Sequence, residues 1–214
     1  MATLDHLIFA SRDLGAGVDL IEAKTGVRAV AGGPHPGIGT HNALMTFDDE
    51  TYFEVIAVDP DQPEPSRPRP FRLDEDPGPR LAGFAIHPSG GDTIESLAEL
   101  MRDGGFDPGE IASMSRQRPD GALIEWALTI GGDWERRSNA CLPFVIDWGS
   151  TPSPALSAPK VGDLVAAEIT HPDTAVLALA ERLDVGLVVS EGPARLAARI
   201  ATANGEVVLE SSSG

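Results

Sequence analysis

Residues 4–10 read LDHLIFA, and the plan that begins with them returns twice further along the chain. An apolar strand leads into a short polar turn, and an amphipathic helix follows and ends at glycine. The second copy begins with LAGFAIH at residues 81–87, and the third with VAAEITH at residues 165–171. A repeat of this length corresponds to a supersecondary unit of several elements and not to the short unit of a solenoid. The repeat therefore decides the fold.

Each copy carries the signals of a strand, a helix and further strands. An aspartate stands just before each expected helix, where it can accept hydrogen bonds from free amides: Asp13, Asp92 and Asp173. Glycines after the helices fit left-handed C-terminal caps. Apolar runs follow, and Asp-Gly at residues 120–121 and Asn-Gly at residues 204–205 are strong hairpin signals. Each copy thus predicts a strand, a helix and two or three strands.

The predicted fold class is α+β, with repeated βαβββ modules whose mixed sheet curls around a cleft. The first module is expected at residues 1–58, the second at residues 80–149 and a partial third at residues 165–214, and together they could form one compact globular unit. Residues 59–79 contain seven prolines, and residues 150–164 begin with a run rich in serine and proline. Both stretches are expected to be extended connectors that join no sheet.

Charge and composition exclude several classes of protein. Among 214 residues, 16 Lys and Arg stand against 33 Asp and Glu, so the net charge is −17 and the pI is about 4.5. Such a chain lacks the basic face that nucleic acids and anionic membranes require. No apolar run approaches the roughly 18 residues of a membrane span, and the first residues lack the pattern of a secretion signal, so we expect a cytoplasmic protein. Cys141 is the only cysteine, which excludes an intrachain disulfide and a multi-cysteine zinc site.

Two polar side chains interrupt apolar strands of the first module. His6 lies on the same face of its strand as Ile8, where an imidazole must find a partner or lose its solvation. Glu54 stands between Phe53 and Val55 in the last strand of the module. Two such residues in one small module suggest one site. The alternative is that they only pair with each other, as a satisfied polar contact at the mouth of a barrel.

Several runs resemble those of a glyoxalase-like family within the vicinal oxygen chelate superfamily, which includes glyoxalases, extradiol dioxygenases and drug-binding resistance proteins. They are LDHLIFA at residues 4–10, YFEVIA at 52–57, GTHNAL at 39–44, SRQRPDG at 115–121 and LPFVIDWG at 142–149. The resemblance covers nearly the whole chain. It implies the fold more specifically than the reaction, because one fold hosts many functions.

The resemblance also implies a divalent metal. In the superfamily, the histidine of the first strand and the glutamate of the closing strand are often ligands, and these are His6 and Glu54 here. A second module normally completes the ligand set. At the position of His6, the later copies carry Gly83 and Ala167. His41 begins a strand directly before the Glu54 hairpin and could supply the third ligand. His35 lies among turn-forming residues, which we do not expect to hold its geometry.

Other residues are candidates for contact with a ligand. Arg116 and Arg118 would point to the same side of an extended strand, and guanidinium groups bind carboxylates or phosphates in a forked geometry. Alternatively, both arginines pair with acidic side chains on the surface. Trp126 and Trp148 could form flat apolar walls, and Asp147 is a further candidate beside Trp148.

Two functions remain open for such a site, with a small molecule as the partner in both and a homodimer as a possible assembly. In the first, a metal polarises a carbonyl or enediolate oxygen and Glu54 moves a proton as general base, which defines a metal-dependent lyase or isomerase. In the second, the cleft binds a small, anionic molecule without metal and without catalysis, as resistance proteins of this superfamily do. Glycine and alanine at the position of His6 in the later copies favour the second.

Overall fold

The structure is a computed structural model that describes residues 1–76, 78–117, 123–136 and 140–211. The first module contains one helix and four strands: β1 (Ala2–Ala10), α1 (Leu14–Thr25), β2 (Val30–His35), β3 (Thr40–Thr46) and β4 (Tyr52–Val58). The second has the same order with a short extra helix: β5 (Arg80–Pro88), α2 (Ile94–Asp103), β6 (Gly109–Gln117), β7 (Leu123–Gly131), α3 (Asp133–Arg136) and β8 (Phe144–Asp147).

The third copy of the repeat also forms a helix and four strands: β9 (Asp163–His171), α4 (Thr174–Leu183), β10 (Val188–Glu191), β11 (Arg195–Thr202) and β12 (Gly205–Glu210). Two 3₁₀ helices lie in the connectors: η1 (Pro70–Glu75) and η2 (Pro154–Leu156). Within the described ranges, no helix is long and apolar enough to cross a membrane.

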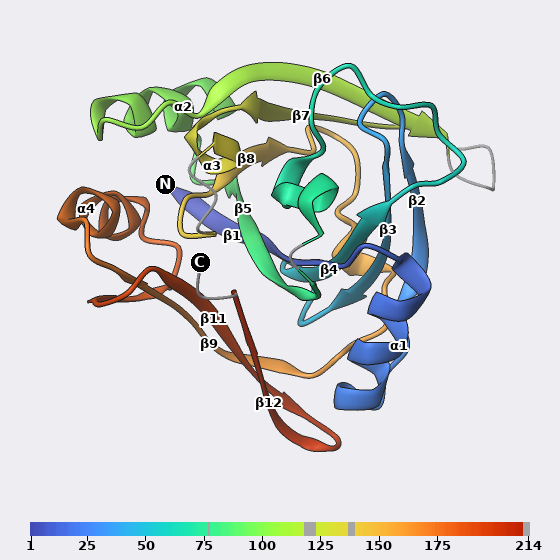
Figure 1. Cartoon of the computed structure of the whole chain (residues 1–214). Helices are drawn as coiled ribbons and strands as arrows, with labels where there is room; N and C mark the ends of the chain where they lie inside the picture. Colours follow the sequence, from blue (N-terminus) through green and yellow to red (C-terminus); the bar gives the residue numbers. More distant parts are fainter. Residues whose placement is uncertain (77, 118–122, 137–139, 212–214) are drawn as a thin grey trace.

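The first two modules share one eight-stranded sheet with the order β2-β3-β4-β1-β5-β8-β7-β6. Strand β1 lies parallel to β4 and antiparallel to β5, so the modules join through their first strands. The sheet curls around the connector between the modules, which lies inside the curve in Figure 1. The prediction of an α+β fold with a curled mixed sheet around a cleft is confirmed.

The helix ends follow the predicted signals with two differences. Asp13 and Asp173 cap α1 and α4 through their side chains as expected. At α2, however, Thr93 and not Asp92 is the cap, because its hydroxyl and that of Ser96 satisfy each other's backbone amides. The left-handed position after α4 is occupied by Asp184, where a glycine was expected.

The third copy keeps the element order but pairs its strands differently. Its separate four-stranded sheet has the order β10-β9-β11-β12, so β9 lies beside the two strands that follow α4 and not beside the last one. It cannot extend the centre of the large sheet, because β1 and β5 already use both of their edges. Instead, Ile169 and Leu196 pack into the same hydrophobic core as Leu7 and Ile86.

The proline-rich connector is not the extended linker that its composition predicted. It turns back into the curl of the large sheet and forms η1, in which Phe71 and Leu73 are buried. Arg69 is also buried, and its Nε donates a hydrogen bond to the carbonyl of Gly39 at 2.9 Å. The guanidinium of Arg69 further binds Asp74 at 2.6 Å. Internal ion pairs and apolar contacts therefore replace sheet hydrogen bonds in this segment.

The shared core predicts that the third copy and the first two modules unfold together. Leu196→Ala removes a fully buried side chain from β11, which should cost about 2–5 kcal/mol and lower the melting temperature by roughly 5–15 °C. All three tryptophans lie before residue 149, so their fluorescence reports on the other sheet. We expect fluorescence and far-UV circular dichroism to shift together.

Val208→Ala is the matched control, because Val208 lies exposed on β12 and its truncation should change the melting temperature little. An unchanged fluorescence midpoint in Leu196→Ala, with a circular dichroism transition split in two, would show that the third copy is an independent unit.

Candidate functional site

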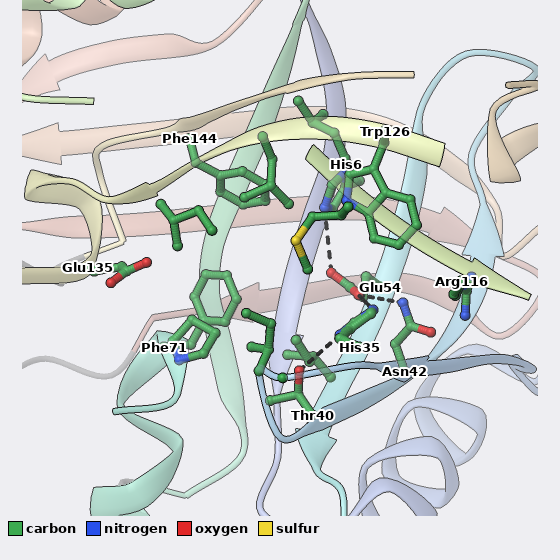
Figure 2. Close-up of a pocket in the computed structure, with 18 of the residues that line it drawn as sticks. His6, His35, Thr40, Asn42, Glu54, Phe71, Arg116, Trp126, Glu135 and Phe144 are labelled. Atoms are coloured by element: carbon green, nitrogen blue, oxygen red, sulfur yellow. Dashed lines mark hydrogen bonds and ion pairs between the residues drawn. The ribbon is translucent and has the colours of Figure 1, made fainter. Parts of the chain in front are cut away.

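A cavity of about 120 Å³ lies inside the curl of the large sheet. Since an engineered cavity of about 150 Å³ binds benzene, this cavity has room for a molecule of about the size of one small ring. Its walls come from β1, the β2–β4 strands, β6–β8, α3 and the connector. Most of the lining is apolar, and Figure 2 shows a polar cluster of His6, His35, Asn42 and Glu54 on one side. This is the usual character of a small-molecule site.

The polar cluster begins at an irregularity in β1. The pairing of β1 with β5 shifts by one residue between Leu4 and His6, which is a β-bulge. In a regular strand, neighbouring side chains point to opposite faces, and a bulge removes that restriction. Asp5 and His6 therefore meet, with 2.6 Å between Asp5 Oδ1 and His6 Nδ1, and both side chains are buried.

Asp5 is held from three directions although water does not reach it. Besides His6, the ring of His87 lies with Nδ1 at 3.0 Å from Asp5 Oδ2, and Trp148 Nε1 donates to the same oxygen at 3.1 Å. Burial opposes the ionisation of Asp5, but the hydrogen bonds from the two imidazoles outweigh it and lower the pKa of Asp5. Asp5 is thus a buried carboxylate that orients the imidazole of His6.

On its other side, His6 faces Glu54 across the parallel β1–β4 pair. Their Nε2 and Oε2 atoms lie 3.5 Å apart, and Asn42 donates a hydrogen bond of 2.6 Å to Glu54 Oε1. Burial alone would lower the pKa of His6, but Asp5 and Glu54 raise it to about 9. Burial would likewise raise the pKa of Glu54, but His6 and Asn42 bring it down to about 2. At neutral pH, an imidazolium therefore stands between two carboxylates, with its ring stacked on Tyr52 at 4.3 Å.

His35 joins this cluster, which corrects the expectation that its loop could not hold it. It is the last residue of β2, paired with Thr40 across the hairpin. Its Nδ1 lies 2.9 Å from Thr40 Oγ1, and its Nε2 lies 3.9 Å from Glu54 Oε1. Burial, more than any neighbouring charge, lowers the pKa of His35, so this imidazole is neutral at pH 7. The signal in the sequence was the short hairpin itself, because GIG between His35 and Thr40 allows a tight turn.

His41, the predicted third metal ligand, lies elsewhere. Thr40 and Asn42 line the cavity, and strand alternation turns the side chain between them to the opposite face of β3. There, His41 Nδ1 lies 4.0 Å from Asp59 Oδ1. Asn42, which the sequence did not single out, takes the place beside Glu54.

The remaining candidates divide between the cavity and other surroundings. Arg116, Trp126 and Trp148 line the cavity. The guanidinium of Arg116 lies against the backbone at Gly33, since a Cβ there would come within 2.5 Å of Nη1. Arg118 lies outside the described residues.

Asp147 is not part of the cavity wall. Its neighbours Ile146 and Trp148 both face the cavity, so Asp147 points away from it. Its Oδ1 accepts a hydrogen bond of 2.8 Å from the amide of Gly149, which stabilises the turn after β8. Asp147 therefore serves a local structural role in place of the predicted ligand contact.

The residues of the site do not fit the metal that the resemblance implies. His6 faces one oxygen of Glu54 and His35 faces the other. The two imidazoles therefore flank the carboxylate, and the three groups do not point at one common position. Across the cavity, the second module contributes Phe144 from β8, and Phe71 of the connector lies against Gly83. Among the described residues, no three His, Cys, Asp or Glu side chains are arranged to hold a metal ion.

Comparison with known proteins identifies the family of this chain. Residues 4–184 match a family described as a glyoxalase-like domain. This match spans most of the chain, which therefore belongs to this glyoxalase-like family. No curated protein matches the chain.

Among solved structures, a hypothetical protein from Staphylococcus aureus is similar over 100% of this chain and 87% of its own, with 16% identity and a TM-score of 0.61. A methylmalonyl-CoA epimerase from Mycobacterium tuberculosis is similar over 67% of this chain and 85% of its own, with 13% identity and a TM-score of 0.39. A Streptomyces coelicolor methylmalonyl-CoA epimerase in complex with 2-nitronate-propionyl-CoA covers 67% of this chain and 95% of its own, at 16% identity and a TM-score of 0.42. At these identities the likeness concerns the fold alone.

The raised pKa of His6 predicts a pH-dependent stability. Because the folded protein binds this proton more tightly, the stabilisation is complete below pH 6.5 and is lost as the pH rises through about 9. The lowered pKa of Glu54 acts at the other end, where its stabilisation is present above pH 4.5 and is lost as the pH falls through about 2. We expect the melting temperature to fall between pH 6.5 and pH 9, and to fall less steeply in His6→Gln. Equal slopes in the parent and in His6→Gln would contradict the buried imidazolium.

The arrangement of ligands predicts that divalent metals do not stabilise the protein. A metal at a hundred times its dissociation constant would add about 2.7 kcal/mol, or roughly 5–10 °C for a chain of this size. We expect the melting temperature in chelator to equal that in excess Zn²⁺, Mn²⁺ or Ni²⁺. A stabilisation of this size that disappears in His6→Gln would restore the metal site.

Proposed function

We propose that this protein is an isomerase or lyase that binds a small carbonyl compound in the cavity and transfers a proton without a metal. The observation that carries this proposal is the polar cluster, in which two imidazoles with opposite pKa shifts flank one buried carboxylate at the edge of an apolar cavity. Titratable groups whose surroundings separate their pKa values are typical of acid–base catalysis.

The low pKa of Glu54 leaves His35 as the general base. A base works best with a pKa near the operating pH, and the pKa of Glu54 is about 2. Glu54 is also engaged by His6 and Asn42. His35 is neutral, and in the tautomer whose Nδ1–H donates to Thr40 Oγ1, its Nε2 is unprotonated and can accept a proton.

In the proposed step, His35 Nε2 takes a proton from the carbon beside the carbonyl. The electron pair of the broken C–H bond moves into a new C=C bond, and the carbonyl oxygen gains negative charge. A cation that lines the cavity would stabilise this charge, and Arg116 is such a cation. Return of the proton to another position completes an isomerisation, whereas loss of a leaving group completes a lyase reaction.

A second candidate function is binding without turnover, which the balance of charges in the cluster favours. Asp5, His6 and Glu54 already satisfy one another through contacts of 2.6 and 3.5 Å. Buried ion clusters of this kind can serve structure alone. In that case, the apolar walls would do the binding and the cluster would only shape the closed side of the cavity.

Deuterium exchange separates the two functions. Small ketones, 2-oxo acids and thioesters are incubated with the protein in D₂O with chelator, and ¹H NMR follows the loss of the α-proton signals. We expect exchange in at least one compound, slowed by about 10²–10⁴-fold in His35→Gln and unchanged in His41→Gln. Binding without exchange would support the second function. Exchange that persists at full rate in His35→Gln would exclude His35 as the base.

A further inference from the structure

The walls of the cavity collect aromatic rings from a chain that has few of them. Aromatic residues make up 5% of the sequence, yet all three tryptophans and the single tyrosine line this cavity. Phe71 and Phe144 add two more rings, and Figure 2 shows both to the left of the polar cluster. This concentration of rings at one cavity points to the shape of the bound molecule.

Five of the rings form two groups. In one group, Trp134 lies 4.9 Å from Phe144 and 5.5 Å from Phe71 between ring centres, at angles of 35° and 42°. In the other, Trp126 and Trp148 are 5.7 Å apart at 42°. Aromatic pairs prefer tilted and offset arrangements of this kind, so a bound flat ring would meet the surroundings that rings favour.

Phe71 reaches the cavity through a strained backbone. Phe71 and Arg72 have φ angles of 58° and 53°, in the left-handed region that residues other than glycine rarely adopt. The strain is held by Arg69, which ties the segment to Gly39 and Asp74, and by Arg80, which donates a hydrogen bond to the carbonyl of Phe71. Strained residues persist where the surroundings enforce them, and they cluster at ligand sites.

The opposite wall is shaped to receive this ring. A Cβ at Gly83 would come within 3.1 Å of Phe71 Cε1, so glycine at this position of β5 lets the ring lie against the strand. Gly83 is the counterpart of His6 in the second module. An aromatic contact therefore occupies the half of the site where a metal ligand was expected.

We propose that the molecule bound in this cavity carries a flat aromatic ring, and that Phe71 is the residue that selects it. The inference rests on the proposed function, because the group attached to the ring must reach His35 and Glu54. The cavity of about 120 Å³ is close in size to a cavity of about 150 Å³ that binds benzene, so it suits a compound with a single ring.

Matched pairs of probes test the ring without changing the polar group. The pairs are acetophenone with cyclohexyl methyl ketone, and benzoate with cyclohexanecarboxylate, measured by isothermal titration calorimetry in chelator. Ring–ring contact should make the aromatic member of at least one pair bind about 2- to 12-fold more tightly. Equal affinities in both pairs, or no binding of either aromatic probe, would overturn the inference.

Variants assign the preference to Phe71. Phe71→Leu should reduce the affinity ratio to near one and leave the affinity of the cyclohexyl probe within about twofold, and Phe71→Met serves if the leucine variant does not fold. Phe47→Leu, which removes a buried ring outside the cavity, should keep the parent's ratio. A ratio that survives in the Phe71 variants would overturn the role of Phe71. The Glu54→Gln and His35→Gln variants keep the aromatic rings. If these variants lose the exchange of α-protons but keep the affinity ratio, the preference for a ring stands independently of the proposed reaction.

Discussion

The buried chain of contacts from Asp5 through His6 to Glu54 is the constraint on which the rest of the site depends. Isolated charges are unstable away from water, so each carboxylate requires the imidazolium between them. The bulge in β1 makes this possible, because it brings two sequence neighbours to one side of the strand. Asn42 then completes the contacts of Glu54, and the hairpin that carries Asn42 also carries His35.

The two modules repeat their elements without repeating their chemistry. The first places charged groups at the cavity, and the second places aromatic and aliphatic side chains there, such as Phe144 and Ile146. An apolar half next to a charged half lowers the local dielectric and separates the pKa values of His6 and His35. Gly83 stands at the position of His6 in the second module. The second module therefore leaves its half of the cavity apolar, which supports the acid–base chemistry proposed for the first module.

Two segments outside the eight-stranded sheet, the connector and the third copy of the repeat, complete the cavity and its support. The prolines of the connector prevent regular sheet pairing. Ion pairs around Arg69 hold the connector in place, and its Phe71 lines the cavity. The third copy of the repeat packs its own sheet against the core, because the central strands have no free edge. The third copy packs against β5 and α1, and its described residues contribute no wall of the cavity.

The sequence by itself determined the repeat, the α+β class and the roles of His6 and Glu54 as buried polar residues, because these depend on local periodicity and on charged groups in apolar strands. It also identified Arg116, Trp126 and Trp148 near the cavity. It could not determine that His35 and not His41 joins Glu54, because the hairpin register decides which of them faces inward. The bulge at Asp5, the fold of the connector and the pairing of the third copy were decided by tertiary structure, since each depends on contacts between residues far apart in the chain.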